Sequence, residues 1–234
     1  MRIIIGLFMI FIFVFAHDTP YSLKKFQKVL DGSKLQAPVS KYNSLYARKY
    51  GDFKYFENRY FYLQDDIYMV FYMCGVKQRS ELRRRNSWKV ATKKPKILEA
   101  EVKLFPLNAK REFTFLQIHD DSTKEPYNNK PLLRIAWMKE HNNKKDHIWA
   151  IIKIIYMGIY RNLKLDMGKM SKEFMNVKIE VINSKLNVWV NKKNKIKDFN
   201  LLYWKNYYNY FKAGIYLQDD GCAKALFNKL SIKD

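Results

Sequence analysis

Short segments of alternating polar and apolar residues, separated by polar turns, constrain the fold of this 234-residue chain more than any other feature. Successive side chains of a strand point to opposite faces, so such alternation is typical of strands with one buried face. Nine short segments between polar turns are rich in β-branched and aromatic residues, and some of them alternate in this way: Tyr60–Leu63, Ile67–Cys74, Ile97–Phe105, Phe113–His119, Leu132–Trp137, Ile148–Tyr156, Val177–Ile182, Leu186–Val190 and Tyr210–Gln218. The sequence therefore predicts an all-β fold, a two-sheet antiparallel sandwich or jelly roll.

Three other segments complete this prediction. "VKIEVI" and "LNVWV", joined through residues 183–185, are typical of a β-hairpin. The tail Ala223–Leu230 fits either a short helix or a closing strand. From His17 to about Leu35 we expect a loosely ordered segment with one helical turn around Leu23–Leu30.

The first 16 residues, "MRIIIGLFMIFIFVFA", have the features of a secretory signal peptide. Arg2 precedes the apolar run Ile3–Phe15, and Val14 and Ala16 supply the small residues of a cleavage site. The run is short for a membrane span, which needs about 20 residues, so a retained anchor is the weaker alternative. We expect a mature chain from near His17 that is secreted or periplasmic.

The formal net charge is +22, from 44 Lys plus Arg against 22 Asp plus Glu. Such an excess favours a polyanionic partner, which is nucleic acid, an anionic membrane or an acidic polysaccharide. The alternative is a compositional bias toward lysine on solvated faces. Export favours carbohydrate over nucleic acid.

The chain has two cysteines, Cys74 and Cys222. In an exported protein two cysteines can form one bridge, and both the bridged and the free states stay open here. They lack the clustering of a structural zinc site.

"RSELR" (79–83) also alternates and adds a further expected strand, and it shares with "FLQIH" (115–119) and "YFKAGIYLQ" (210–218) a polar face opposite the apolar one. A sheet face that is merely solvated usually carries scattered Lys, Thr and Glu. The polar faces here hold Arg79, Glu81, Arg83, Gln117, His119, Tyr210, Lys212, Tyr216 and Gln218. Each motif alone has a simpler interpretation; Arg-x-Glu-x-Arg, for example, is typical of a cross-strand ion-pair ladder. Their coincidence predicts a functional site.

These three blocks, in this order, resemble the signature blocks of polysaccharide lyase family seven, the alginate lyases. The similarity extends to "KVLDGSKLQAPVS", "NKPLLRIAW" and "VKIEVINSKLNVWVN", so it covers residues 28–234 and leaves 17–27 as an N-terminal lead-in. The resemblance implies a β-jelly roll whose concave sheet forms a cleft for an anionic polyuronate. We expect a monomer that binds alginate, and neither nucleic acid nor, after signal cleavage, a membrane.

The resemblance also implies the site residues. The catalytic group would be Arg79, Gln117, His119 and Tyr216, and the surrounding binding and supporting positions would be Glu81, Arg83, Lys212 and Gln218. The family needs no metal or other cofactor. This sequence departs from the family pattern at Arg84 and Arg85, where an acidic residue is common, and at Asp219 and Asp220.

The implied reaction is endolytic β-elimination, which leaves an unsaturated uronate at the non-reducing end. Arg79 would pair with the uronate carboxylate through its planar fork, helped by Gln117, so that charge can develop beside it. His119 is a suitable base for the C5 proton, and Tyr216, with an ordinary pKa of about 10, a suitable acid for O4. A cation such as Lys212 or Arg83 could lower the pKa of Tyr216 and let the phenolate act as base.

Other functions stay open at this point. The same residues would serve a lyase on another polyuronate, such as a glucuronan. A non-catalytic jelly roll that binds acidic polysaccharide would not require an acid and a base, and a nucleic-acid binder conflicts with export. The acidic pairs Asp65-Asp66, Asp120-Asp121 and Asp219-Asp220 fit loop caps better than a calcium or glycosidase site, because adjacent side chains on a strand diverge.

Overall fold

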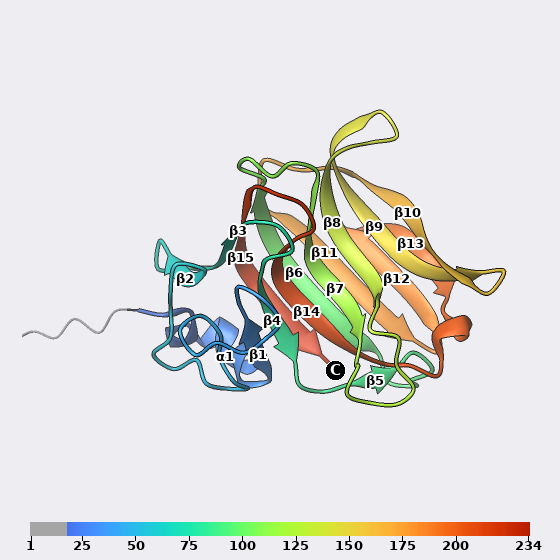
Figure 1. The fold of residues 1–234 in the computed structure, drawn as a ribbon, viewed down its shortest axis with the longest axis horizontal. Coiled ribbons are helices and arrows are strands. Elements are labelled where there is room, and N and C mark those ends of the chain that lie inside the picture. The colour runs from blue at the N-terminus through green and yellow to red at the C-terminus, as the bar shows by residue number, and fades with distance from the viewer. Residues whose placement is uncertain (1–17) are drawn as a thin grey trace, which may run out of the picture.

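Two antiparallel sheets, packed face to face around one core, form the fold in the computed structural model, which describes residues 18–234 (Figure 1). The expected signal peptide, residues 1–16, lies outside the described residues. Within residues 18–234, no helix has the length and hydropathy that crossing a membrane requires. The all-β prediction is confirmed, and each of the nine expected segments lies in a strand.

The first sheet has eight strands. Its order is β1 (Ser33–Gln36), β4 (Arg79–Arg84), β14 (Tyr208–Leu217), β7 (Glu112–Asp120), β8 (Pro131–His141), β9 (Lys144–Tyr156) and β10 (Ile159–Lys169), with the short β5 (Trp88–Lys89) also paired to β14. The second sheet has seven strands, in the order β13 (Lys193–Asn200), β12 (Lys185–Val190), β11 (Met175–Ile182), β6 (Lys96–Phe105), β15 (Cys222–Lys233), β3 (Tyr68–Cys74) and β2 (Phe61–Gln64).

The inner faces of both sheets are apolar, as the alternation predicts. On β14, the side chains of Phe211, Ala213, Ile215 and Leu217 are all fully buried. Burial of an aliphatic or aromatic side chain of this size contributes roughly 1.5–3 kcal/mol. This inner face fixes the orientation of the strand, so the alternate residues of β14 must face outward.

The expected hairpin is present, and the C-terminal tail is a strand. β11 and β12 pair through a two-residue turn in which Asn183 and Ser184 have φ of 50° and 57°, as the tight hairpin turns require. The tail is the closing strand β15, which pairs with β3 and β6. β10 and β13 were not predicted because they carry few buried side chains. In β13 only Ile196 is buried.

The helical turn expected around Leu23–Leu30 is present, but the N-terminal segment is packed and ordered instead of a loose lead-in. A short 3-10 helix, η1 (Pro20–Ser22), leads into α1 (Lys24–Asp31), which lies beside β1 and packs on β15 (Figure 1). Phe26, Val29 and Leu30 are spaced three and four residues apart and are buried. The helix is therefore part of the core. A further 3-10 helix, η2 (Leu202–Trp204), precedes β14.

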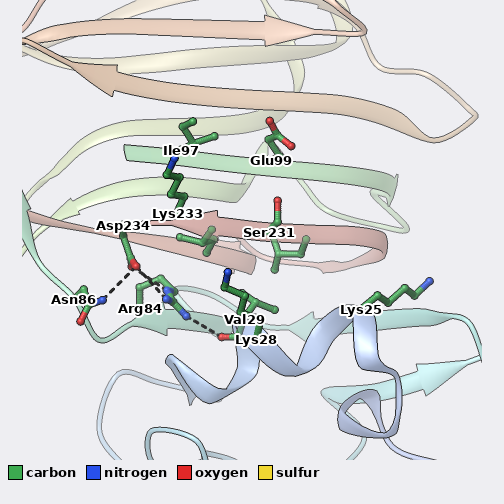
Figure 2. A pocket seen from close by; sticks show the side chains of 12 residues that line it. Lys25, Lys28, Val29, Arg84, Asn86, Ile97, Glu99, Ser231, Lys233 and Asp234 are labelled. Atoms are coloured by element: carbon green, nitrogen blue, oxygen red, sulfur yellow. Dashed lines mark hydrogen bonds and ion pairs between the residues drawn. The ribbon is translucent and has the colours of Figure 1, made fainter. Parts of the chain in front are cut away.

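Arg84 ties α1 to the C-terminal end of β15 (Figure 2). Its Nε and Nη2 donate to the Asp234 carboxylate at 2.9 and 3.0 Å, and its Nη1 donates to the Val29 carbonyl at 3.1 Å. The two side chains are only 9% and 3% exposed. A cavity of about 630 Å³ lies beside this ion pair, away from the three polar strand faces. The unusual arginine at this position thus has a structural partner.

Cys74 and Cys222 form a disulfide between β3 and β15, at positions that are paired in the sheet register. Of the two states that the sequence leaves open, the structure has the bridged one. The bridge joins two neighbouring strands of the seven-stranded sheet.

Candidate active site

A cleft of about 590 Å³ crosses the outer face of the eight-stranded sheet. Seven of the eight predicted site residues line it: Arg79, Arg83, Gln117, His119, Lys212, Tyr216 and Gln218. They come from β4, β7 and the β14 segment, which are adjacent in the sheet although far apart in the sequence. The cleft therefore collects the three polar strand faces into one site.

Gly214 lets β14 approach β4 closely enough to form this site. Its φ is +142°, and a Cβ at this position would lie 2.2 Å from the Ser80 carbonyl oxygen. The pairing of β14 with β7 shifts at this point, between Ala213 and Tyr216. Such a bulge re-aims side chains, and here Lys212 and Tyr216 on either side of it both line the cleft.

Glu81, expected among the binding and supporting residues, lies in a supporting position and not at the cleft surface. Its side chain is buried and does not line the cleft. Gln117 Nε2 donates to Glu81 Oε1, and Lys212 Nζ lies 2.5 Å and Arg79 Nη1 3.6 Å from Glu81 Oε2. Because a buried carboxylate needs such partners, Glu81 holds three cleft residues in position from below.

His119 is set up as a neutral base. Its Nδ1 lies 2.8 Å from the Asp120 carbonyl oxygen, which can only accept, so Nδ1 carries the proton and Nε2 keeps its lone pair. Burial, followed by the positive charge of Lys212, lowers the pKa of His119 from 6.5 to about 4. Tyr210 stacks on the imidazole, with ring centroids 5.7 Å apart, and holds its orientation.

The two flanking arginines each lie on a tyrosine ring. The Arg79 guanidinium is 4.3 Å from the centroid of Tyr216, and the Arg83 guanidinium is 4.1 Å from that of Tyr210. Arg83 also pairs with Asp121 at 2.8 Å. Lys212 or Arg83 was expected to be the cation beside Tyr216. In the structure Arg79 occupies that place, and Lys212 pairs with Glu81.

The acidic pair Asp120-Asp121, at the end of β7, has structural partners. Asp120 accepts hydrogen bonds from the backbone N–H groups of Asn128 and Asn129, both at 2.7 Å, and so fixes the loop that follows. Within the described part of the chain, no three His, Cys, Asp or Glu side chains come together as metal ligands would. The charge-neutralising groups of the cleft are instead arginine, lysine and amide side chains.

Sequence reasoning missed part of the cleft. Arg134 on β8, Lys153 on β9 and Asn162 on β10 also line it. The signal that marks the first two is a single basic residue inside an apolar strand, in "LLRIAW" and "AIIKIIY". On such a strand the apolar neighbours face the core, so the basic side chain must face the opposite side.

A neutral histidine and a tyrosine share one cationic cleft with an arginine and an amide on a two-sheet sandwich, an arrangement that suits the acid–base chemistry of a polysaccharide lyase. The family model of the alginate lyases matches residues 29–234, and the chain belongs to that family. The expected jelly roll and the suspected family are thereby confirmed.

Three comparisons describe the relationship. An alginate lyase of Photobacterium sp. is 29% identical in a match that covers 90% of this chain and 86% of that protein. The structure of alginate lyase AlyC3 superposes with a TM-score of 0.82 at 29% identity, over 93% of this chain and 96% of that one. The family-7 alginate lyase A1-II′, at 22% identity, covers 88% of this chain and 95% of its own and superposes with a TM-score of 0.71, so it shares the fold.

Proposed function

We propose that this protein cleaves alginate by endolytic β-elimination, with His119 as base and Tyr216 as acid. The observation that carries the proposal is the geometry of His119, whose bond to the Asp120 carbonyl leaves Nε2 unprotonated in a cleft that Tyr216 also lines. Support also comes from the relatives: the Photobacterium protein is an alginate lyase, and AlyC3 has been solved with dimannuronate bound.

Arg79 and Gln117 bind the carboxylate of the uronate that is cleaved. Loss of the C5 proton puts negative charge beside this carboxylate, so the step is slow unless the carboxylate is neutralised. A guanidinium and an amide N–H supply that neutralisation before the reaction starts. Removal of one such donor typically costs about 2.7–4 kcal/mol in activation free energy.

The elimination transfers two protons and breaks the C4–O4 bond. His119 Nε2 takes the proton from C5, the electron pair left on C5 forms the C4–C5 double bond, and the C4–O4 bond breaks. Tyr216 donates its phenolic proton to the leaving O4. Proton exchange with water then returns both side chains to their starting states. Glu81 holds Gln117 and Arg79 in place throughout.

The central experiment measures the absorbance of the new double bond on a panel of polyuronates, with the wild type, His119→Ala and Tyr216→Phe. We expect turnover on alginate and a loss of at least about 100-fold in each variant, because general acid–base groups contribute about 10²–10⁴-fold. Tyr55→Phe is the matched control, since Tyr55 is 84% exposed and does not line the cleft. Near-normal turnover in both site variants would refute the assignment.

Two outcomes would favour the rival functions. Turnover on a glucuronan, with none on alginate, would assign the same residues to another polyuronate. Binding of acidic polysaccharides by a folded wild type, without any absorbance change, would favour a non-catalytic binding module.

The preferred alginate block follows from the strand that carries Gln117 and His119. Ile118 lies between them and is fully buried, so it sets the position of both without touching the sugar. In this family an isoleucine here accompanies acceptance of guluronate, and we expect polyguluronate or mixed blocks to be cut at least as fast as polymannuronate. Initial rates on the three separated block types measure this, and strict selectivity for polymannuronate would contradict it.

We also propose a secreted or periplasmic monomer that begins near His17 after loss of residues 1–16. N-terminal sequencing of the exported protein and its elution volume in size-exclusion chromatography test both points. A retained leader would instead support the membrane anchor.

A further inference from the structure

The cleft extends beyond the residues of the three signature blocks. It continues over β8, β9 and β10, where Arg134, Lys153 and Asn162 line it. Arg134 is paired in register with Gln117 on one side and with Ile151 on the other, and Lys153 is paired with Asn162. Adjacent strands are about 4.8 Å apart, so Lys153 lies on the order of 10 Å from Gln117, two strands away.

Lys153 differs from the other cations that line the cleft. Arg79 and Lys212 pair with Glu81, Arg83 pairs with Asp121, and Arg134 pairs with Glu112 at 2.7 Å. Lys153 forms no ion pair with any residue of the described chain, 18–234. Its Nζ donates to the neutral Asn162 Oδ1 at 2.6 Å.

The surroundings of Lys153 are also positive. Burial, together with the charges of Arg134 and Lys130, lowers the pKa of Lys153. None of the residues that line the cleft in the described structure is a carboxylate. A half-buried ammonium among other cations is unfavourable by itself, and an anion bound beside it would remove that cost.

We propose that Lys153, with Arg134 and Asn162, forms a subsite that binds the carboxylate of a uronate residue near the one that is cleaved. The inference rests on the proposed function. A polyuronate carries one carboxylate on every sugar, so a chain held by Arg79 and Gln117 presents further carboxylates across the strands. The hydrogen bond to Asn162 holds the Lys153 ammonium beside a second residue that lines the cleft, and the Asn162 amide N–H groups remain for a sugar hydroxyl.

The test is steady-state kinetics of the wild type and Lys153→Gln on alginate oligomers of increasing length. We expect KM to rise roughly 10- to 100-fold for long oligomers, which is the loss typical of one charge-assisted hydrogen bond, with kcat nearly unchanged. The shortest oligomer that is cut, which does not reach Lys153, should show no change. Lys153→Arg should restore most of the affinity.

Lys145→Gln is the matched control, because Lys145 is an exposed lysine on the same strand and does not line the cleft. An equal rise in KM for this control would show general attraction of the polyanion and overturn the subsite. A wild-type KM at every oligomer length, or a fall in kcat alone, would overturn it as well. Failure of the proposed function would give a different result from failure of the subsite, because the wild type itself would then be inactive.

Discussion

At the scale of single residues, the environment of His119 sets the pH at which the cleft works. Its pKa is lowered to about 4 by burial and by the charge of Lys212, so the imidazole stays neutral well below its ordinary pKa of 6.5. A base must be unprotonated to accept the C5 proton. The site therefore keeps its base in the reactive form throughout mildly acidic solution.

We expect kcat/KM to fall with acid through a pKa near 4 and to be nearly constant between pH 5 and 7. The acidic limb of kcat/KM reports the essential base of the free enzyme. Initial rates at low substrate concentration, with circular dichroism at each pH to verify the fold, measure this limb. A limb centred near 6.5 in folded protein would show that the base is not the buried His119.

Residue positions along a strand could be predicted from the sequence, and residue partners could not. The alternation in "YFKAGIYLQ" is local, so it correctly assigns Lys212 and Tyr216 to one face and Ile215 to the other. The bond of Glu81 to Lys212 joins residues 131 positions apart, and no local pattern marks it. The sequence therefore placed Glu81 among the binding and supporting residues without showing which of the two roles it has.

At the scale of secondary-structure elements, the contact between β14 and β4 depends on a glycine at position 214, which has no side chain. Gly214 lies against the Ser80 carbonyl with a φ of +142°, a conformation that residues with a Cβ rarely adopt. We expect Gly214→Ala to lower the free energy of unfolding by more than about 2 kcal/mol and to reduce turnover, because β14 must move away from β4. Urea unfolding and the absorbance assay measure the two effects.

Gly158→Ala is the control for this prediction. Gly158 also has a positive φ, of +74°, but a Cβ there would meet nothing within 4 Å. Its replacement carries the conformational cost of roughly 1 kcal/mol without the clash. Equal losses in the two variants would show that backbone conformation alone, and not the close approach of β4, explains the effect at Gly214.

Elements were predicted where their buried face is rich in apolar residues and missed where it is not. β14 and β11 have clear alternation, and both were expected. α1 has three buried side chains in eight residues, which is too short a pattern to distinguish a packed helix from a loose turn. Its order comes from contacts with β15, near the other end of the chain.

At the scale of the whole molecule, the Arg84–Asp234 pair links the first helix to the last strand. We expect Asp234→Ala to lower the free energy of unfolding by about 3–5 kcal/mol, because Arg84 would then be a buried cation without a carboxylate. Turnover of the folded protein should stay normal, since neither residue lines the cleft. Urea unfolding and the absorbance assay again supply the two readouts.

Glu173→Ala is the control for the ion pair. Glu173 pairs with Lys103 at 3.7 Å, but its side chain is 83% exposed, and such surface pairs contribute at most about 1 kcal/mol. A loss in Asp234→Ala no larger than in this control would refute the role of Arg84.

The position of the last two strands has a consequence for the synthesis of the protein. β14 lies between β4 and β7, and β15 lies between β3 and β6, so both strands are internal to their sheets. Until residues 208–233 have left the ribosome, each sheet is divided into two parts that nothing joins. The two parts of each sheet can therefore become hydrogen-bonded to each other only after this segment has been added.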